Sequence, residues 1–292
     1  MYLAHFGLKE WPFGITPDTD FTYRAPVHEE ALSTLLLALH SGEGFVKVTG
    51  EVGTGKTLLC RTLLDRLATG DDPAVTAYVP NPRLAPAAML RALSRELKKR
   101  TSRANDEHEL YDKLESALLK LAQEGRRVVL CIDEAQALPL DTLEALRLLS
   151  NLETGKRKLL QIVLFGQPEL DTLLSATGCR SLVSRIGFSA RMAALNRHEL
   201  RHYLCHRMAV AGWRGPEAFT PLARWVLWWT SAGVPRAANV LAHKCLMLAY
   251  GEGARQATLK HALAARRDAA LQAPGWLASL RRLTMTDIGA RT

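Results

Sequence analysis

The segment from Gly50 to Thr57, GEVGTGKT, places three glycines and a lysine in eight residues and matches the pattern G-x-x-x-x-G-K-[ST]. Glycines let successive backbone N–H groups turn inward around phosphate oxygens. In this pattern the lysine reaches the β- and γ-phosphates, and the final hydroxyl binds Mg²⁺. We therefore expect a nucleotide-binding loop made of Gly50, Glu51, Val52, Gly53, Thr54, Gly55, Lys56, Thr57 and Leu58.

A second chemical signal is VVLCIDEAQ at 128–136, an apolar run that ends in two adjacent carboxylates. Ligands bind at the carboxyl ends of strands in open parallel sheets. We expect Asp133 to hold Mg²⁺ through water and Glu134 to polarise the attacking water. The second carboxylate favours a hydrolase over a nucleotide-dependent switch, because it supplies a base.

A third apolar run, LLQIVLFG, predicts a strand, and Gln167 follows it directly. We expect Gln167 to orient the water together with Glu134. The alternative role of Gln167 is a turn residue before Pro168. Hydrolysis also needs positive charge on the γ-phosphate, and a neighbouring subunit can supply an arginine. We expect Arg185 to act in this way, and Arg180 is the second candidate in the same segment.

Arg236, in GVPRAANVL, opens a helical segment further along the chain. An arginine there can sense the nucleotide in its own subunit and move a lid. We therefore include Arg236 among the catalytic candidates.

The elements around these residues alternate between strands and helices. The apolar runs at 45–49, 74–81, 128–132 and 158–166 read as buried strands, RIGFSARM as a last strand, and the segments between them as helices. Such alternation predicts an α/β fold with a parallel sheet covered on both faces.

The pattern changes near residue 194, where four helical segments follow without strands. We predict an extended, aromatic N-terminal arm at 1–30, an α/β nucleotide-binding domain at 31–194, a small all-helical lid at 195–272 and a basic tail at 273–292. Trp225, Trp228 and Trp229 share one face of a predicted lid helix. We expect them in the lid core, with a docking patch as the alternative.

Composition and charge limit the classes of function. Residues 176–292 hold 17 Lys and Arg against 5 Asp and Glu, whereas residues 1–175 hold 21 against 24. The basic C-terminal part suits an acidic partner, nucleic acid or simply a solvated surface. Five scattered cysteines fit a reducing compartment, and no apolar run approaches the roughly 20 residues of a membrane span. We expect a cytoplasmic protein without its own transmembrane segment, which can still dock at the inner membrane.

With the loop, the DE pair, Gln167, the SRI arginine and GVPR in this order, the chain resembles AAA+ ATPases. The stretches HFGLKEWPFGITPDTDFTY, IDEAQALP, VLFGQPELD and GVPRAANVLAHKCLMLAYGEG resemble the ExeA/GspA group of the general secretion pathway, over about residues 1–270. Members of that group carry a membrane segment and a peptidoglycan-binding part after the ATPase. The sequence to Thr292 holds neither, so we do not expect peptidoglycan binding from it.

The resemblance implies an AAA+ P-loop core with a helical lid, the cofactors ATP and Mg²⁺, and a homo-oligomer, either a ring or an open ring. It also implies an inner-membrane assembly protein of a pilus or secretion system as the partner. The rival hypothesis is a DNA-bound ATPase of the kind that regulates target selection in transposition, which the basic C-terminal part keeps open.

Overall fold

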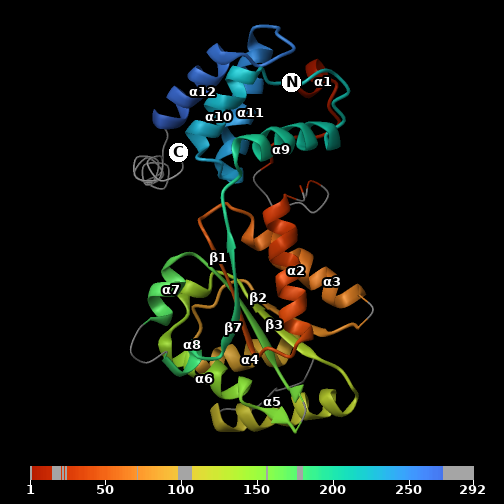
Figure 1. Ribbon diagram of the computed structural model, residues 1–292, viewed down its shortest axis with the longest axis vertical. Helices are drawn as coiled ribbons and strands as arrows, with labels where there is room; N and C mark the ends of the chain where they lie inside the picture. Colours follow the sequence, from red (N-terminus) through yellow and green to blue (C-terminus); the bar gives the residue numbers. More distant parts are fainter. Residues whose placement is uncertain are drawn as a thin grey trace. The chain divides into compact units, whose positions relative to one another are not determined.

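The computed structural model describes residues 2–14, 21, 23, 25–70, 72–97, 107–155, 157–175 and 180–271 (Figure 1). Contacts divide the chain into two compact units. The helical unit contains the residues up to Ala25, Gly53–Gly55 and those from Ala193 onward, and the α/β unit contains Pro26–Val52 and Lys56–Met192. The sequence analysis placed the corresponding boundaries after residues 30 and 194. No helix within the described ranges combines the length and the apolarity that a bilayer crossing requires.

The α/β unit is built on a five-stranded parallel sheet with the strand order β2-β3-β6-β1-β7. Its strands are β1 (Phe45–Gly50), β2 (Val75–Val79), β3 (Val128–Ile132), β6 (Gln161–Gly166) and β7 (Ile186–Met192). Around it lie α2 (Pro26–His40), α3 (Lys56–Thr69), α4 (Pro86–Glu96), α5 (Glu107–Gln123), η1 (Ala135–Ala137), α6 (Leu140–Ser150), α7 (Glu169–Leu174), α8 (Arg180–Val183) and the small antiparallel pair β4 (Glu153–Thr154) and β5 (Arg157–Lys158).

Side chains along the central strands alternate between two apolar cores. In β3, Leu130 and Ile132 pack in the core that α4, α5 and α6 cover, whereas Val129 and Cys131 pack in the core that α2 and α3 cover. Because successive side chains of a strand point to opposite faces, both faces of this sheet are buried. The predicted α/β fold is therefore confirmed. Because both faces of the sheet are buried, the strand sequences are uninterrupted apolar runs.

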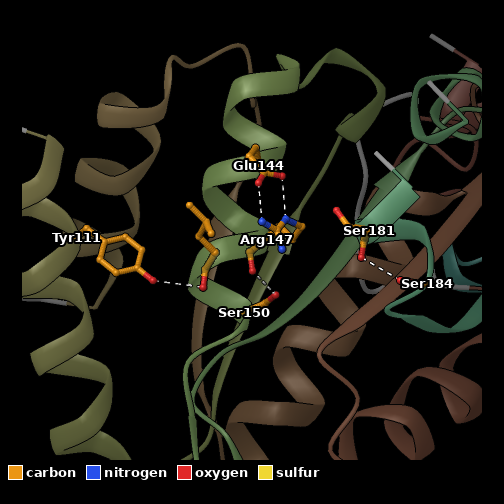
Figure 2. A network of polar contacts seen from close by, with 7 residues as sticks. Tyr111, Glu144, Arg147, Ser150, Ser181 and Ser184 are labelled. Atoms are coloured by element: carbon orange, nitrogen blue, oxygen red, sulfur yellow. Dashed lines mark hydrogen bonds and ion pairs between the residues drawn. The ribbon is translucent and has the colours of Figure 1, made fainter. Parts of the chain in front are cut away.

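Helix α6, which follows the acidic end of β3, carries a network of polar contacts (Figure 2). The Arg147 guanidinium donates to both carboxylate oxygens of Glu144, at 2.8 and 2.6 Å. This hydrogen bond from Arg147 holds the pKa of Glu144 below its ordinary value. From α5, the Tyr111 hydroxyl donates to the Leu148 carbonyl at 3.3 Å. The network ties α6 to α5 on the surface of the α/β unit.

The helical unit contains α1 (Tyr2–Phe6), α9 (Arg197–Val210), α10 (Pro221–Ser231), α11 (Pro235–Gly251) and α12 (Leu259–Leu271). Sequence signals fix where these helices begin. Asn196 and Glu199 form a capping box at the start of α9, and the Thr220 hydroxyl accepts the Ala223 N–H at the start of α10. The four helices expected after residue 194 are present.

The N-terminal aromatic residues belong to the helical unit. Tyr2, Phe6, Phe13 and Phe21 are buried in one apolar cluster with residues of α9, α10, α11 and α12. The first residues form helix α1 rather than an extended chain, because Tyr2 and Phe6 lie one turn apart and bury the same face. The predicted tail at 273–292 lies outside the described residues.

Two of the three tryptophans of α10 are not core residues. Trp225 and Trp229 remain 42% and 39% exposed and stack on each other with ring centroids 6.0 Å apart. The half-buried Trp228 donates its indole N–H to the Leu195 carbonyl at 3.1 Å. The prediction of a tryptophan stripe in the core is therefore wrong for Trp225 and Trp229, because Val226 and Leu227 supply the buried face of α10.

Candidate nucleotide-binding and catalytic site

The glycine-rich loop joins the end of β1 to the start of α3. Gly50 ends the strand, residues 51–55 form the loop and residues 56–58 begin the helix. Gly53 and Gly55 have φ angles of +84° and +101°, a left-handed conformation that other residues adopt at a cost. The loop therefore leads directly into the N-terminal N–H groups of α3, which is the arrangement that binds phosphate.

Lys56 lies inside this loop with only 6% of its surface exposed. Its ammonium group donates to the carbonyl oxygens of Gly50 and Glu51 at 2.7 and 2.9 Å. Burial lowers the pKa of Lys56, and the nearby carboxylates of Glu134 and Asp133 oppose that effect. The side chain is thus a positioned cation at the loop, where the phosphates of a nucleotide bind.

Thr57 and Asp133 meet across the end of the sheet. The Thr57 hydroxyl donates to Asp133 Oδ2 at 2.7 Å, and Asp133 is buried with 3% exposure. A hydroxyl and a carboxylate are the hard oxygen donors that Mg²⁺ prefers, and Mg²⁺ takes few protein ligands while keeping its waters. No group of three or more His, Cys, Asp or Glu within the described ranges is placed to hold a metal. The pair fits a magnesium ion that phosphates and water also coordinate.

Glu134 has an unusual backbone conformation for a non-glycine residue, with φ 52° and ψ 37°. Its N–H donates to Asp133 Oδ1 at 2.9 Å, so the carboxylate that faces Thr57 also fixes this turn. A left-handed residue of this kind costs about 1–2 kcal/mol and is retained where its surroundings impose it. The turn places the Glu134 carboxylate next to the end of β6.

Two amide side chains hold that carboxylate. Gln136 Nε2 and Gln167 Nε2 both donate to Glu134 Oε2, at 2.6 and 3.1 Å. Gln136 also accepts the backbone N–H of Gln167 on its Oε1, at 3.0 Å. The side chain of Gln136 therefore bridges the ends of β3 and β6 and orients the base candidate between them.

Gln136 is a site residue that the sequence analysis did not identify. It lies in the single turn of η1, where no periodic pattern indicates which way a side chain points. The available signal was its position in IDEAQ, two residues after Glu134. Only the pairing of β3 with β6 brings it to Gln167.

Arg185 lies at the other end of the sheet. It immediately precedes β7, and Ile186 pairs with Phe45 at the start of β1, whereas Met192 pairs with Gly50 at the start of the loop. Five residue steps along β1 at about 3.3 Å each separate these ends by roughly 17 Å. The side chain of Arg185 is exposed. Its positive charge contributes weakly to lowering the pKa of Glu153, which is lowered mainly by a hydrogen bond from Lys158. Arg180 begins α8.

Arg236 is the second residue of α11, and its side chain is exposed. Within the helical unit, its backbone N–H donates to the Gly53 carbonyl at 3.3 Å. A Cβ atom at Gly53 would lie 2.6 Å from the Arg236 Cβ, so only glycine allows this approach. The backbone of Arg236, the arginine expected to sense the nucleotide, therefore lies against Gly53 within this unit.

The strand-loop-helix segment, the buried lysine and the acidic strand end together define a P-loop nucleotide site on a parallel α/β sheet. Comparison with protein families agrees: residues 39–174 match the model of the AAA domain. The chain thus contains an AAA domain of the P-loop NTPase class.

Among known proteins, the chain is 40% identical over 256 residues to general secretion pathway protein A of Aeromonas hydrophila. The aligned region covers 88% of this chain and 46% of that protein, so the chain is its homologue and spans about half its length.

Solved structures share the fold at low sequence identity. A chain of Drosophila ORC bound to DNA is 19% identical with a TM-score of 0.63, covering 94% of this chain and 67% of that one. The RuvB Holliday junction branch migration motor of Thermotoga maritima is 18% identical with a TM-score of 0.54, covering 88% and 73%. At this identity the likeness concerns the fold, including the C-terminal helical part.

Proposed function

We propose that this chain is an ATP hydrolase that uses Mg²⁺. The observation that carries the proposal is the position of the Glu134 carboxylate, held by Gln136 and Gln167 at the sheet edge that also bears Lys56 and Asp133. A scaffold that only binds nucleotide needs the loop and the lysine but no oriented base. The match of residues 39–174 to the AAA domain supports the same class.

In this mechanism each residue has a separate task. The loop N–H groups and Lys56 hold the β- and γ-phosphates, and Thr57 and Asp133 hold the magnesium ion, which neutralises charge that develops on the phosphates. Glu134 accepts a hydrogen bond from the attacking water and polarises it for in-line attack on the γ-phosphate. Gln167 keeps the carboxylate and the water in place.

The positive charge that completes the site comes from a second copy of the chain in a homo-oligomer, a ring or an open ring. Arg185 is our candidate, because its end of the sheet is roughly 17 Å from its own glycine-rich loop. Arg236 acts in its own subunit and transmits the state of the loop to the helical lid. The domain division in this proposal is an N-terminal arm at 1–30, an α/β domain at 31–194, the helical lid at 195–272 and a basic tail at 273–292.

We further propose that hydrolysis drives or regulates assembly of a pilus or secretion machine. Within the ExeA/GspA group, our candidate is MshM, the ATPase of mannose-sensitive haemagglutinin type IV pilus biogenesis. The partner in this proposal is an inner-membrane assembly protein, and the ATPase works on the cytoplasmic side as a peripheral protein. The homologous secretion-pathway protein supports a secretion system as the setting.

Phosphate release measured on purified protein tests the enzymatic part. Glu134→Gln should bind ATP·Mg²⁺ normally and lower turnover by roughly 10²-fold or more, because it keeps the shape and removes the base. Glu124→Gln, an exposed change at the end of α5, is the matched control and should retain full turnover. Wild-type turnover in Glu134→Gln would show that another group activates the water.

The DNA-bound alternative rests on the basic C-terminal part, with 17 Lys and Arg against 5 Asp and Glu in residues 176–292. A gel shift with duplex DNA, with and without ATP, distinguishes the two roles. ATP-dependent binding of the duplex would favour regulation of transposition target selection. Loss of pilus or secretion assembly on deletion, rescued by wild type but not by Glu134→Gln, would favour assembly.

A further inference from the structure

The helical unit contains an open cleft of about 550 Å³ that none of the nucleotide-site residues lines. Three segments form it: the turn after α1, the loop between α9 and α10, and the turn before α12. Its volume is within the ~300–1,000 Å³ typical of ligand-binding clefts. Its lining residues are Phe6, Gly7, Lys9, Gly212, Trp213, Arg214, Gly215, Pro216, Arg255 and Gln256.

Charge distinguishes this cleft from an ordinary surface depression. Three of its lining residues, Lys9, Arg214 and Arg255, are cationic and exposed, and none is acidic. Among the described residues, none of these three side chains takes part in an ion pair or a hydrogen bond. Three cations that line one cleft with no acidic residue in the lining favour an anionic ligand, and arginine pairs with carboxylates in a two-pronged geometry.

Two glycines, Gly212 and Gly215, allow close packing at the cleft. Gly212, with φ +98°, brings Lys9 so close that a Cβ atom there would lie 3.2 Å from the Lys9 Cγ. A Cβ atom at Gly215 would lie 2.5 Å from Trp213 Cζ2, so this glycine lets the indole ring fold over the loop. The indole N–H of Trp213 donates to the Pro216 carbonyl at 2.6 Å, and the backbone N–H of Lys9 donates to the Ala211 carbonyl at 2.8 Å.

Part of the cleft wall is apolar. The Trp213 ring packs edge to face against the buried Phe6, with centroids 5.8 Å apart, and Pro216 adds to the same wall. Because the indole N–H already has an acceptor, Trp213 offers a ligand only apolar surface. The ligand must therefore combine negative charge with an apolar group.

We propose that this cleft docks a short segment of a partner protein in which Asp or Glu residues flank an apolar or aromatic side chain. The carboxylates pair with Lys9, Arg214 and Arg255, and the apolar side chain packs on Trp213. Nucleic acid fits less well, because even a small nucleic-acid-binding module buries about 600–1,000 Å² along a strip of positive charge, whereas these cations surround one confined cleft. The inference concerns partner docking and does not depend on ATP hydrolysis.

A phage-displayed library of random 12-residue peptides, selected on the full chain without nucleotide, tests the proposal. Enriched sequences should place Asp or Glu within two positions of Phe, Trp, Tyr or Leu. Fluorescein-labelled copies should then bind in anisotropy measurements, and their affinity should fall as salt rises. A library that enriches nothing, or enriches peptides without acidic residues, would overturn the proposal.

Substitutions of cleft residues test whether the selected peptides bind in the cleft. Arg214→Glu/Arg255→Glu should weaken the selected peptides at least about tenfold, whereas the control Arg197→Glu/Arg267→Glu, two exposed arginines of the same unit outside the cleft, should change affinity less than about twofold. Gly215→Ala tests the wall without changing charge and should also weaken binding. Thermal melts of each variant separate lost binding from lost folding.

Binding of a labelled 20-nucleotide single-stranded DNA tests the competing hypothesis that the cleft is a nucleic-acid site. If it binds wild type and loses affinity in Arg214→Glu/Arg255→Glu while no peptide does so, the cleft is a nucleic-acid site and the proposal is wrong. Equal binding of the peptides to both double variants would also contradict it.

Discussion

Replacing Gln136 tests whether the Glu134 carboxylate must be held for hydrolysis. Gln136→Ala removes two contacts at once, the 2.6 Å hydrogen bond to Glu134 and the 3.0 Å bond that the Gln167 N–H donates. Gln167 Nε2, at 3.1 Å, remains as a second hydrogen-bond donor to that carboxylate. The backbone at Glu134 should persist, because the Asp133 carboxylate fixes it independently.

The expected size of the effect follows from these contacts. A hydrogen bond to a charged group contributes about 1.5–3 kcal/mol, and each ~1.4 kcal/mol of lost transition-state stabilisation is a factor of ten in rate. If the hydrogen bond from Gln136 to Glu134 stabilises the transition state by this amount, turnover should fall about 10- to 100-fold. ATP affinity should change less than about twofold, since no hydrogen bond among the described residues joins Gln136 to Lys56 or to the glycine-rich loop.

The assay is steady-state phosphate release over a range of pH, with ATP affinity measured separately by a fluorescent nucleotide analogue. Gln136→Glu adds a readout that a purely structural role would not give. Its carboxylate lies beside Glu134 and disfavours the charged form, so the acid limb of the pH–rate profile should move to higher pH. Gln123→Ala, at the end of α5, is the matched control.

Two results would refute this reasoning. Unchanged or increased turnover in Gln136→Ala would show that the amide does not orient a working base. An unmoved acid limb in Gln136→Glu would show that Glu134 is not the group that titrates there.

The remaining predictions concern three other positions. Lys56→Ala should lose ATP binding in a nucleotide titration, because the phosphates lose their fixed cation. Arg185→Ala should keep ATP affinity and lose hydrolysis, and mixing it with Glu134→Gln should restore part of the activity; no recovery in demonstrably mixed oligomers would exclude action across an interface. Because Arg147 lowers the pKa of Glu144, that ion pair stabilises the fold above the ordinary carboxyl range and loses its effect as pH falls through the lowered pKa. Glu144→Gln should thus lower the thermal midpoint by about 1 °C at neutral pH, from a few tenths of a kcal/mol, and this difference should disappear once the pH falls below the lowered pKa of Glu144.

The sequence predicts the α/β fold and the phosphate loop well because their signals are local. The glycine spacing, the lysine and the apolar runs each lie within a few residues of what they determine. Gln136 was not predicted as a site residue, because its partner Gln167 is 31 positions away in the sequence and contacts it only after β3 and β6 pair. For the same reason, the burial of Tyr2 and Phe6 against helices of the C-terminal part was not evident.

The strand register explains why a single chain is expected to be an incomplete enzyme. Gly50, Asp133 and Gln167 follow or end neighbouring strands, so one sheet edge collects the phosphate loop, the candidate metal-binding residues and the candidate base. Arg185 lies at the opposite edge, roughly 17 Å away along β1, which exceeds the ~8–10 Å screening length at physiological salt. Within its own subunit, this separation argues against Arg185 as the group that stabilises charge on a γ-phosphate. If Arg185 contributes to hydrolysis, it must therefore do so in a neighbouring subunit, and turnover per chain should rise with protein concentration.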